Sequence, residues 1–513
     1  MSSFLPISPL YTPASPPTHS PAGIVLNRCD GPLTMVEFNS YNEYPSHSSH
    51  HLPGEINTVR GNKNWMHARE GVLKSVHFGA DLDLLYPIIE KGGSDSAAFD
   101  NVLELLVVNG VLTLPEAVMM LIPEAWQDNA LMEPEKRAFY KWAACLQEPW
   151  DGPALFAFSD GRYCGANLDR NGLRPCRFIV TSEDIMVCAS EVGAISIEPE
   201  KVVQKGRLKP GRMLLVDTKE GRIVDDRELK LTTSRKHDFT IWVENMLLLP
   251  DIVKRVQRHV SVDVKVDSVP LSLDPVLLAF GWTVEQLILL ILPMVSNGKE
   301  GLGSMGNDVS LACMANQPRL LYEYFRQLFA QVTNPPIDSL REKIVMSLEA
   351  YVGPEGNLLE QNPSQCHRIF LPSPIVTIEE MNALKNLKLA YPKWSSVTID
   401  ITFPKSHGLP GYRAAIDRIC EESIQAISNG MKVVILSDRA AGPGRVPLSA
   451  LIACGAVHHH LVRNKQRVKA ALMIETGEAR EVHHCCVLVG YGADAVCPYL
   501  TFETIHKVSN EKM

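Results

Sequence analysis

The chain has 513 residues, of which 45% are hydrophobic and 21% charged, and its formal net charge is −8. This length predicts two to four globular domains, and the composition excludes a chain that is disordered throughout. The mild acidity and the lack of a long basic run argue against nucleic acid as a partner. The longest apolar run, at about residues 287–295, is shorter than the roughly 20 residues that span a bilayer, so no membrane partner is predicted.

Twelve cysteines are scattered along the chain without a CxxC pair. This usage predicts reduced thiols in a cytoplasmic compartment, although an organelle is not excluded. The adjacent Cys485 and Cys486 and the consecutive histidines 458–460 are poorly arranged to ligate one ion. No metal site is therefore predicted.

Residues 1–53 differ in composition from the rest, with nine prolines, nine serines and four histidines. Such a segment cannot bury enough apolar surface to offset the entropy of ordering, so it is predicted to be mostly disordered.

Residues 54–260 combine helical and strand patterns. Apolar residues at helical spacing predict helices over 101–108 and 114–122. From 154 to 226, short apolar runs alternate with turns such as Asp160-Gly161 and Asn171-Gly172, which predicts an antiparallel β array. An α+β sandwich of sheet and helices is the expected product. Residues 227–268 are predicted to form a charged helical connector.

Residues 268–513 are predicted to form a separate α/β domain. Helices are expected over 274–295, 318–332, 412–428 and 448–463. Strands are expected over 398–403, 432–437, 471–476 and 495–500. The continuous apolar run at 432–437 is typical of a parallel strand buried on both faces, and the alternation of strand and helix predicts βαβ units.

Several glycine-rich motifs occur in a characteristic order. They are GEINTVRGN (54–62), GSDSAAFDN (93–101), EPWDGPA (148–154), DRNGLRP (169–175) and ASEVGA (189–194), followed by GSMGND (303–308), the long segment 317–342, LSDR (436–439) and ETGEAREVHH (475–484). In this order they resemble the glutamate synthase large chain. The first five resemble the back part of its class II glutamine amidotransferase domain, and the others resemble its central domain. A chance match of so many motifs in order is very improbable.

The resemblance implies an N-terminal-nucleophile αββα sandwich, present here in part, followed by the α/β central domain. It implies an oxidoreductase of ammonia assimilation that forms glutamate from glutamine and 2-oxoglutarate, with a glutaminase half-reaction. In the family, FMN and iron–sulfur clusters complete the reaction. No cofactor site is predicted within this chain, because its cysteines lack cluster spacing. A homo-oligomer or a synthase subunit as protein partner is left open, as is the electron donor (NADH, NADPH or ferredoxin).

Two site residues carry over from the family motifs, both as substrate-binding residues. Asp95, in GSDS, matches the aspartate that holds the substrate ammonium, a cation that suits a carboxylate. Gly54 matches the glycine whose backbone N–H faces the oxyanion. Position 53, which is asparagine in the family motif, is proline here and offers neither a side-chain donor nor an N–H.

No catalytic residue is assigned. The family nucleophile is an N-terminal cysteine whose own α-amino group acts as base, whereas this sequence begins with Met1 and its first cysteine, Cys29, lies in a different context. The chain alone is therefore expected to be inactive, as a fragment of a longer enzyme. The alternative is a non-catalytic protein that binds glutamine or a synthase subunit.

Overall fold

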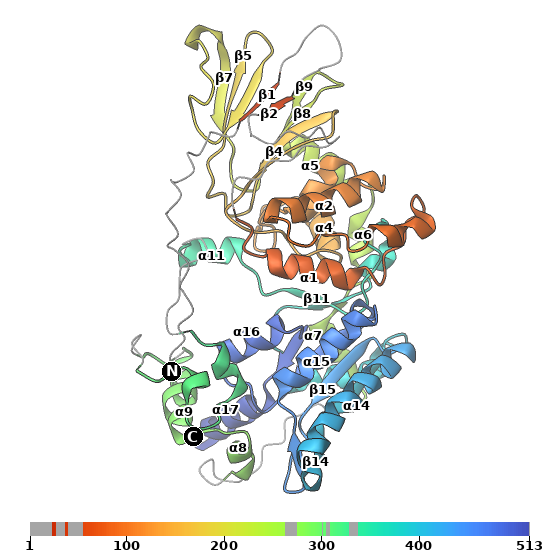
Figure 1. Ribbon diagram of the computed structural model, residues 1–513, viewed down its shortest axis with the longest axis vertical. Helices are drawn as coiled ribbons and strands as arrows, with labels where there is room; N and C mark the ends of the chain where they lie inside the picture. The colour runs from red at the N-terminus through yellow and green to blue at the C-terminus, as the bar shows by residue number, and fades with distance from the viewer. Residues whose placement is uncertain are drawn as a thin grey trace, which may run out of the picture.

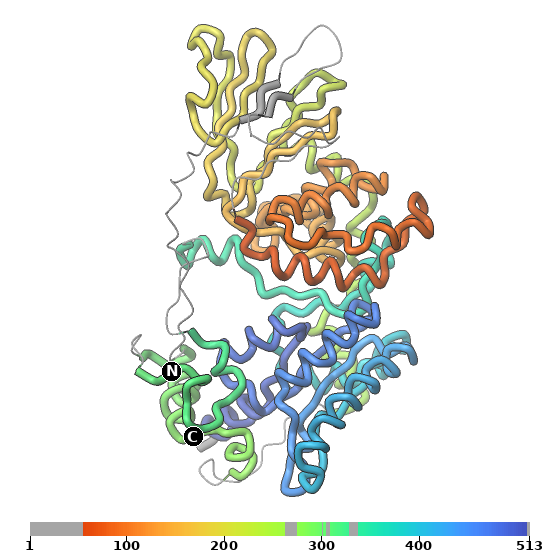
Figure 2. The backbone as a smooth tube through the Cα atoms, in the orientation of Figure 1, coloured from red at the N-terminus to blue at the C-terminus, as the bar shows by residue number. Residues whose placement is uncertain are grey.

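The computed structural model describes residues 23–26, 36–38, 55–261, 274–299, 301–303, 308–327 and 337–511 (Figures 1 and 2). Gly54 lies outside these residues, as does most of the 1–53 segment that was predicted to be disordered. Two short strands of that segment are described, β1 (Gly23–Leu26) and β2 (Val36–Phe38).

A layer of helices opens the first half of the molecule, formed by α1 (Val59–Arg69), α2 (Asp95–Val108), α3 (Leu114–Leu121) and α4 (Pro134–Ala144). Local sequence sets their starts. The Ser94 side chain accepts from Ala97 N at the start of α2, and Thr113 and Glu116 form a capping box on α3. The helices predicted at 101–108 and 114–122 are confirmed, and α2 begins earlier because of its Ser94 cap.

Two sheets lie beside these helices. One has the order β3-β4-β8-β9, with β3 (Leu155–Ser159), β4 (Tyr163–Leu168), β8 (Met213–Asp217) and β9 (Arg222–Val224). The other has the order β2-β1-β6-β5-β7, with β5 (Arg177–Thr181), β6 (Met186–Ala189) and β7 (Val202–Arg207). All pairs in both sheets are antiparallel, as the turn pattern predicted.

Successive side chains along the strands point to opposite faces of the sheet, and this half is therefore built of three layers. Phe156 and Leu215 belong to the core that the helices build, whereas Leu155 and Leu214, one position away, belong to a core shared with the second sheet. The layers therefore run helix, sheet, sheet, and the predicted α+β class is confirmed for this half.

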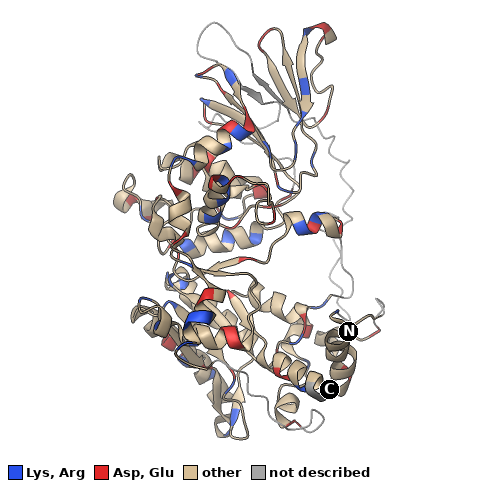
Figure 3. Cartoon of the chain, turned by 180° about the vertical axis from the view of Figure 1, so that it is seen from behind, with Lys and Arg blue, Asp and Glu red and all other residues tan. Residues whose placement is uncertain are grey.

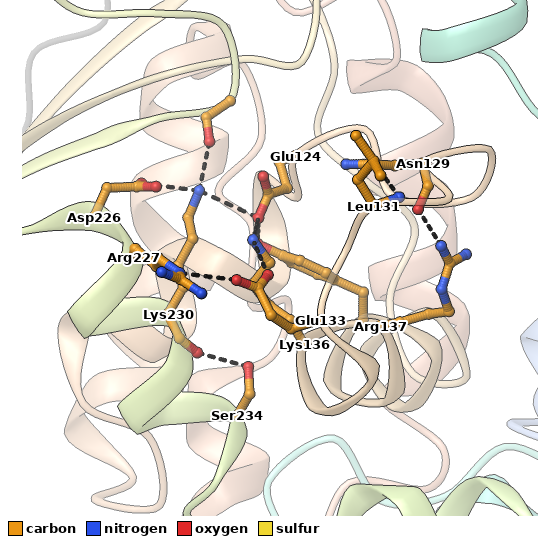
Figure 4. Close-up of polar contacts among 12 residues, drawn as sticks. Glu124, Asn129, Leu131, Glu133, Lys136, Arg137, Asp226, Arg227, Lys230 and Ser234 are labelled. Carbon is orange, nitrogen blue, oxygen red and sulfur yellow. Dashed lines mark hydrogen bonds and ion pairs between the residues drawn. The ribbon is translucent and has the colours of Figure 1, made fainter.

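A charged cluster fastens α5 (Asp226–Ser234) to the end of α3 and to α4 (Figure 4). The ammonium of Lys230, which is 2% exposed, donates to Gly211 O at 2.6 Å and pairs with Asp226 at 2.9 Å and Glu124 at 3.4 Å. Burial pushes the pKa of Asp226 up, but Lys230, the Met213 N–H and Arg212 together outweigh it, and the net pKa is lowered. The cluster thus holds α5 by ion pairs that have little access to water.

The second half is built on a parallel sheet of order β13-β15-β17-β18. Its strands are β13 (Ser396–Asp400), β15 (Val433–Ser437), β17 (Ala471–Glu475) and β18 (Ala495–Cys497). Helices cover both faces: α7 (Leu249–Val256) and α12 (Ile378–Lys385) pack on one, and α14 (Gly408–Ser428) and α15 (Ala450–Arg463) on the other. The predicted βαβ units are confirmed. The run at 398–403 is divided between β13 and the short β14 (Thr402–Pro404), which pairs with β16 (Arg445–Pro447).

The two halves exchange segments where they meet. The strand β10 (Leu247–Leu248) pairs with β12 (Ile369–Leu371), which also pairs with β11 (Ala350–Val352). Leu358, Leu359 and Cys366 pack into the core of the first half. Figure 2 shows this stretch crossing between the halves.

Two expectations about connecting segments need correction. The 227–268 connector contains α7, whose Leu249, Ile252 and Val256 are fully buried in the second core. The helix predicted at 318–332 is only a 3-10 turn, η6 (Leu321–Phe325), as far as residue 327. Its Tyr322 is buried against His484, so tertiary packing has overridden helical spacing.

Charged residues of both signs are interspersed over both halves (Figure 3). Among the described residues, no helix is long and apolar enough to cross a membrane.

Candidate functional site

The motif segments of the first half meet beside the helical layer. Thr58 N donates to Asp151 O at 3.3 Å, and Asp151 N donates to the Thr58 hydroxyl at 3.0 Å. A Cβ placed on Gly152 would lie 2.0 Å from Glu55 O, so only glycine permits this contact. The segments GEINTVRGN and EPWDGPA are therefore packed backbone to backbone.

Asp95 joins this contact from the first turn of α2. Its Oδ2 accepts a hydrogen bond from Ile56 N at 3.2 Å, and the side chain is half-buried. The carboxylate thus lies beside the segment that follows Gly54. The Gly54 prediction falls outside the described residues.

The DRNGLRP loop reaches the same place through a buried carboxylate and an ion pair. The Asp169 carboxylate accepts from Asn171 N at 2.9 Å, Gly172 N at 3.3 Å and Ala154 N at 3.4 Å. Burial raises the pKa of Asp169 to about 6. The Arg170 guanidinium lies 3.0 Å from Asp151.

Asp151 links the EPWDGPA motif to the DRNGLRP loop through its ion pair with Arg170. Burial raises its pKa, although Arg170 opposes the shift. Four of the five motifs are thereby in contact. The fifth, ASEVGA, starts at the end of β6 and continues through exposed residues 191–193.

Sequence reasoning missed two groups that hold this site. The first is α11 (Ser339–Val345), which packs on the DRNGLRP loop: Arg341 donates to Asn171 O, and Arg170 donates to Val345 O at 3.5 Å. The only sequence signal was the acidic cap of α11, where Asp338 accepts from Leu340 N and Arg341 N.

The second group centres on Arg69, which is 2% exposed at the end of α1. Its guanidinium donates to both oxygens of Glu148, at 2.6 and 2.5 Å, and to Glu355 at 2.7 Å. Burial pulls the pKa of Arg69 down, but the two carboxylates outweigh it and raise the pKa. Glu148 opens the EPWDGPA motif, whereas Glu355 comes from the second half, so Arg69 joins the two halves at this site.

A second concentration of buried charge lies at the carboxyl edge of the parallel sheet, where open α/β folds bind ligands. Asp438, which is 0% exposed after β15, accepts from the Thr476 hydroxyl at 2.5 Å and from Gly477 N at 3.0 Å. Burial raises its pKa to about 7.

Two glutamates belong to the same group of charged side chains. Glu475 pairs with Lys385 and Arg439, both at 2.7 Å, and Glu478 accepts from Ala450 N at 2.9 Å. Glu478 also lines an open cleft of about 660 Å³ between residues 279–286 and 318–323. These carboxyl groups bond mainly to neighbouring loops and helix ends, so they order this edge.

Iron–sulfur clusters are held by about four cysteine thiolates. Among the described residues, no group of His, Cys, Asp or Glu side chains could hold a metal ion. These residues therefore do not fit a cluster.

Comparison with known proteins agrees with the motifs. A profile of class II glutamine amidotransferases matches residues 44–242, and a profile of the glutamate synthase central domain matches residues 276–513. The first match begins at residue 44, within the segment 1–53 that is predicted to be mostly disordered.

Three curated relatives illustrate the similarity. The chain is 63% identical over 458 residues to glutamate synthase [NADH] of Schizosaccharomyces pombe and 58% identical over 461 residues to that of Saccharomyces cerevisiae. It is 42% identical over 460 residues to the glutamate synthase [NADPH] large chain of Bacillus subtilis.

Each comparison covers 89% of this chain, but only 22%, 21% and 29% of the respective relatives. The chain thus spans less than a third of their length. The chain belongs to the glutamate synthase family, and it carries class II glutamine amidotransferase sequence followed by the glutamate synthase central domain.

Proposed function

We propose that this chain supplies a glutamine-binding surface and the central scaffold of a glutamate synthase. The complete enzyme would form glutamate from glutamine and 2-oxoglutarate. The observation that carries the proposal is the meeting of Asp95 with the GEINTVRGN and EPWDGPA segments. The identity to the synthases extends across both halves of the chain and supports the same assignment.

Asp95 would hold the α-ammonium of glutamine. Its carboxylate is half-buried, and its bond from Ile56 N fixes it beside the segment that carries Gly54. A carboxylate at the first position of a helix also stabilises the helix by itself. The experiment must therefore separate ligand binding from helix stability.

Gly54 would present its N–H to the amide oxygen of the substrate. Proline at position 53 removes the second donor of the family motif, and the loss of one such donor costs about a hundredfold or more in rate. We therefore assign glutamine binding without efficient hydrolysis to this chain by itself. Release of ammonia from glutamine by the purified chain at an enzyme-like rate would contradict this assignment.

FMN and iron–sulfur chemistry belong, in this proposal, to parts of the synthases outside the matched segment. The two fungal relatives are named for NADH, which favours NADH as the electron donor of the complete enzyme. Activity of that enzyme with NADPH or ferredoxin instead of NADH would overturn this choice.

The glutamine proposal is tested by calorimetry on the purified chain. We expect Asp95→Asn to weaken glutamine binding by roughly 10- to 100-fold, because a hydrogen bond to a charged group contributes about 1.5–3 kcal/mol. Glu104→Gln is the matched control, since Glu104 is an exposed carboxylate on the same helix. The control should bind like the wild type.

The second arm uses 4-carbamoylbutanoate, which keeps the amide and carboxylate of glutamine but lacks its ammonium group. We expect this compound to bind the wild type and Asp95→Asn equally. Equal weakening of both compounds would assign Asp95 a helix-stabilising role only. Absence of glutamine binding by the wild type would remove the proposal.

A further inference from the structure

Two cysteines lie in contact between the two sheets of the first half. Cys176 directly precedes β5, and Cys188 lies in β6, the strand that pairs with β5. Their Sγ atoms are 3.2 Å apart, and both side chains face the shared core. A disulfide has an S–S length of about 2.05 Å, so closing the remaining gap requires a movement of only about 1 Å.

Hydrogen bonds and strand pairing hold the backbone at both cysteines in place. The register pairs Phe178 with Cys188 across β5 and β6, and the carbonyl of Cys176 accepts from Leu208 N at 2.9 Å. The two sulfur atoms share a hydrogen bond in which either thiol can be the donor. This contact with Cys188 lowers the pKa of Cys176, although burial opposes the shift. A lowered pKa increases the share of the nucleophilic thiolate.

The pair also joins two of the motif segments. Cys176 follows DRNGLRP without a gap, and Cys188 is followed directly by ASEVGA. A bond between the two sulfur atoms would tie the first segment, which carries Arg170 and Asp169, to the second, which reaches the surface.

We propose that Cys176 and Cys188 form a reversible disulfide when the protein meets a hydroperoxide. The Cys176 thiolate attacks a peroxide oxygen, the O–O bond breaks, and a sulfenic acid and water form. The Cys188 sulfur then attacks the Cys176 sulfur, the S–O bond breaks, and a second water leaves. Overall, two thiols lose two protons and two electrons, which reduce one hydrogen peroxide to two waters. A small-molecule dithiol reverses the reaction.

Peptide mapping of the full chain tests the proposal. Trypsin places Cys176 on residues 171–177, because the Arg174–Pro175 bond resists cleavage, and Cys188 on residues 178–201. After treatment with hydrogen peroxide and non-reducing alkylation, we expect these two peptides as a linked pair in most molecules. The pair should disappear on reduction.

Variants separate this bond from general oxidation. In Cys176→Ser the linked pair should be lost, and Cys188 should be recovered with a single thiol modification. Cys164→Ser is the matched control, because Cys164 lies in the same core but contacts Ser159 rather than a cysteine. This control should keep the linked pair.

The result for the wild-type protein can contradict the proposal without any variant. If peroxide oxidises the exposed Cys313 and Cys486 while Cys176 and Cys188 both remain open to alkylation after unfolding, the proposal is wrong. Loss of the link in Cys164→Ser, or its survival in Cys176→Ser, would also overturn it. Glutamine binding plays no part in this readout, so failure of one proposal leaves the other standing.

Discussion

Asp438 holds a proton that an aspartate in water would lose. Burial raises its pKa to about 7 in the folded chain, whereas an unfolded aspartate titrates near pH 4. Between these pH values the folded state retains the proton and the unfolded state does not. The contribution of Asp438 to stability is therefore fully present below about pH 4 and is lost as the pH rises through 7.

This difference predicts a pH-dependent effect of Asp438→Asn. The free energy of unfolding of the wild type, relative to the variant, should fall between pH 4 and pH 7.5 by up to about 4 kcal/mol. Urea unfolding at several pH values measures the difference. Thr476→Val is the control, because it keeps the Asp438 carboxyl group. Its stability should show the same dependence on pH, shifted to higher pH, since the hydrogen bond from Thr476 lowers the pKa of Asp438. A pH-independent difference would contradict the prediction.

Single residues were predictable only where a local motif carried them. Asp95 follows its own helix cap in GSDS, and the structure places it against the segment after Gly54. Whether Asp95 binds substrate stays a prediction. The partners of Arg69 could not be foreseen, since Glu355 lies 286 positions away. The contact between Cys176 and Cys188 depends on the register of two strands, which sequence alone leaves open.

At the scale of elements, the Lys230 cluster decides how firmly α5 is held. Lys230→Met should cost about 1–3 kcal/mol of stability, because it removes the buried cation that Asp226 and Glu124 share and leaves the Gly211 carbonyl without its donor. Asp226 keeps Arg212 and Glu124 keeps Lys136. Arg227→Met is the matched control on the same helix. Arg227 is 69% exposed and pairs with Glu133 at 2.9 Å, so its loss should cost less than about 1 kcal/mol. Chemical unfolding compares the two, and equal losses would show that the buried cluster has no special role.

Elements with strong local signals were predictable. The strand expected at 432–437 is β15, because an unbroken apolar run fits a strand covered on both faces. The helix expected at 412–428 ends as predicted at Asn429-Gly430, where Gly430 has φ +83°. Predictions failed where contacts between residues far apart in the sequence determine the structure. Buried Tyr322 holds 321–325 as a short turn. The apolar face of α7 packs into a core that includes residues more than 100 positions away.

At the scale of the whole molecule, packing indicates a boundary earlier than the expected 260/268 division. The helix α7 is buried in the second core, and β10 pairs with β12. We predict that residues 246–513 unfold cooperatively, whereas residues 268–513 give a lower melting temperature and aggregate, because they lack α7 and expose its site. Calorimetry and light scattering on the two fragments measure this. Equal melting temperatures would place the boundary after α7.

The Arg69 pairing has a mechanical consequence. One guanidinium holds Glu148, two residues before Trp150, and also Glu355 on the crossing stretch. Since all three side chains are fixed by short bonds, a shift of the crossing stretch by about an ångström must either break a buried ion pair or drag Glu148 along with it. A displacement of the second half at Glu355 would therefore move the EPWDGPA segment, which packs on the backbone that hydrogen-bonds Asp95.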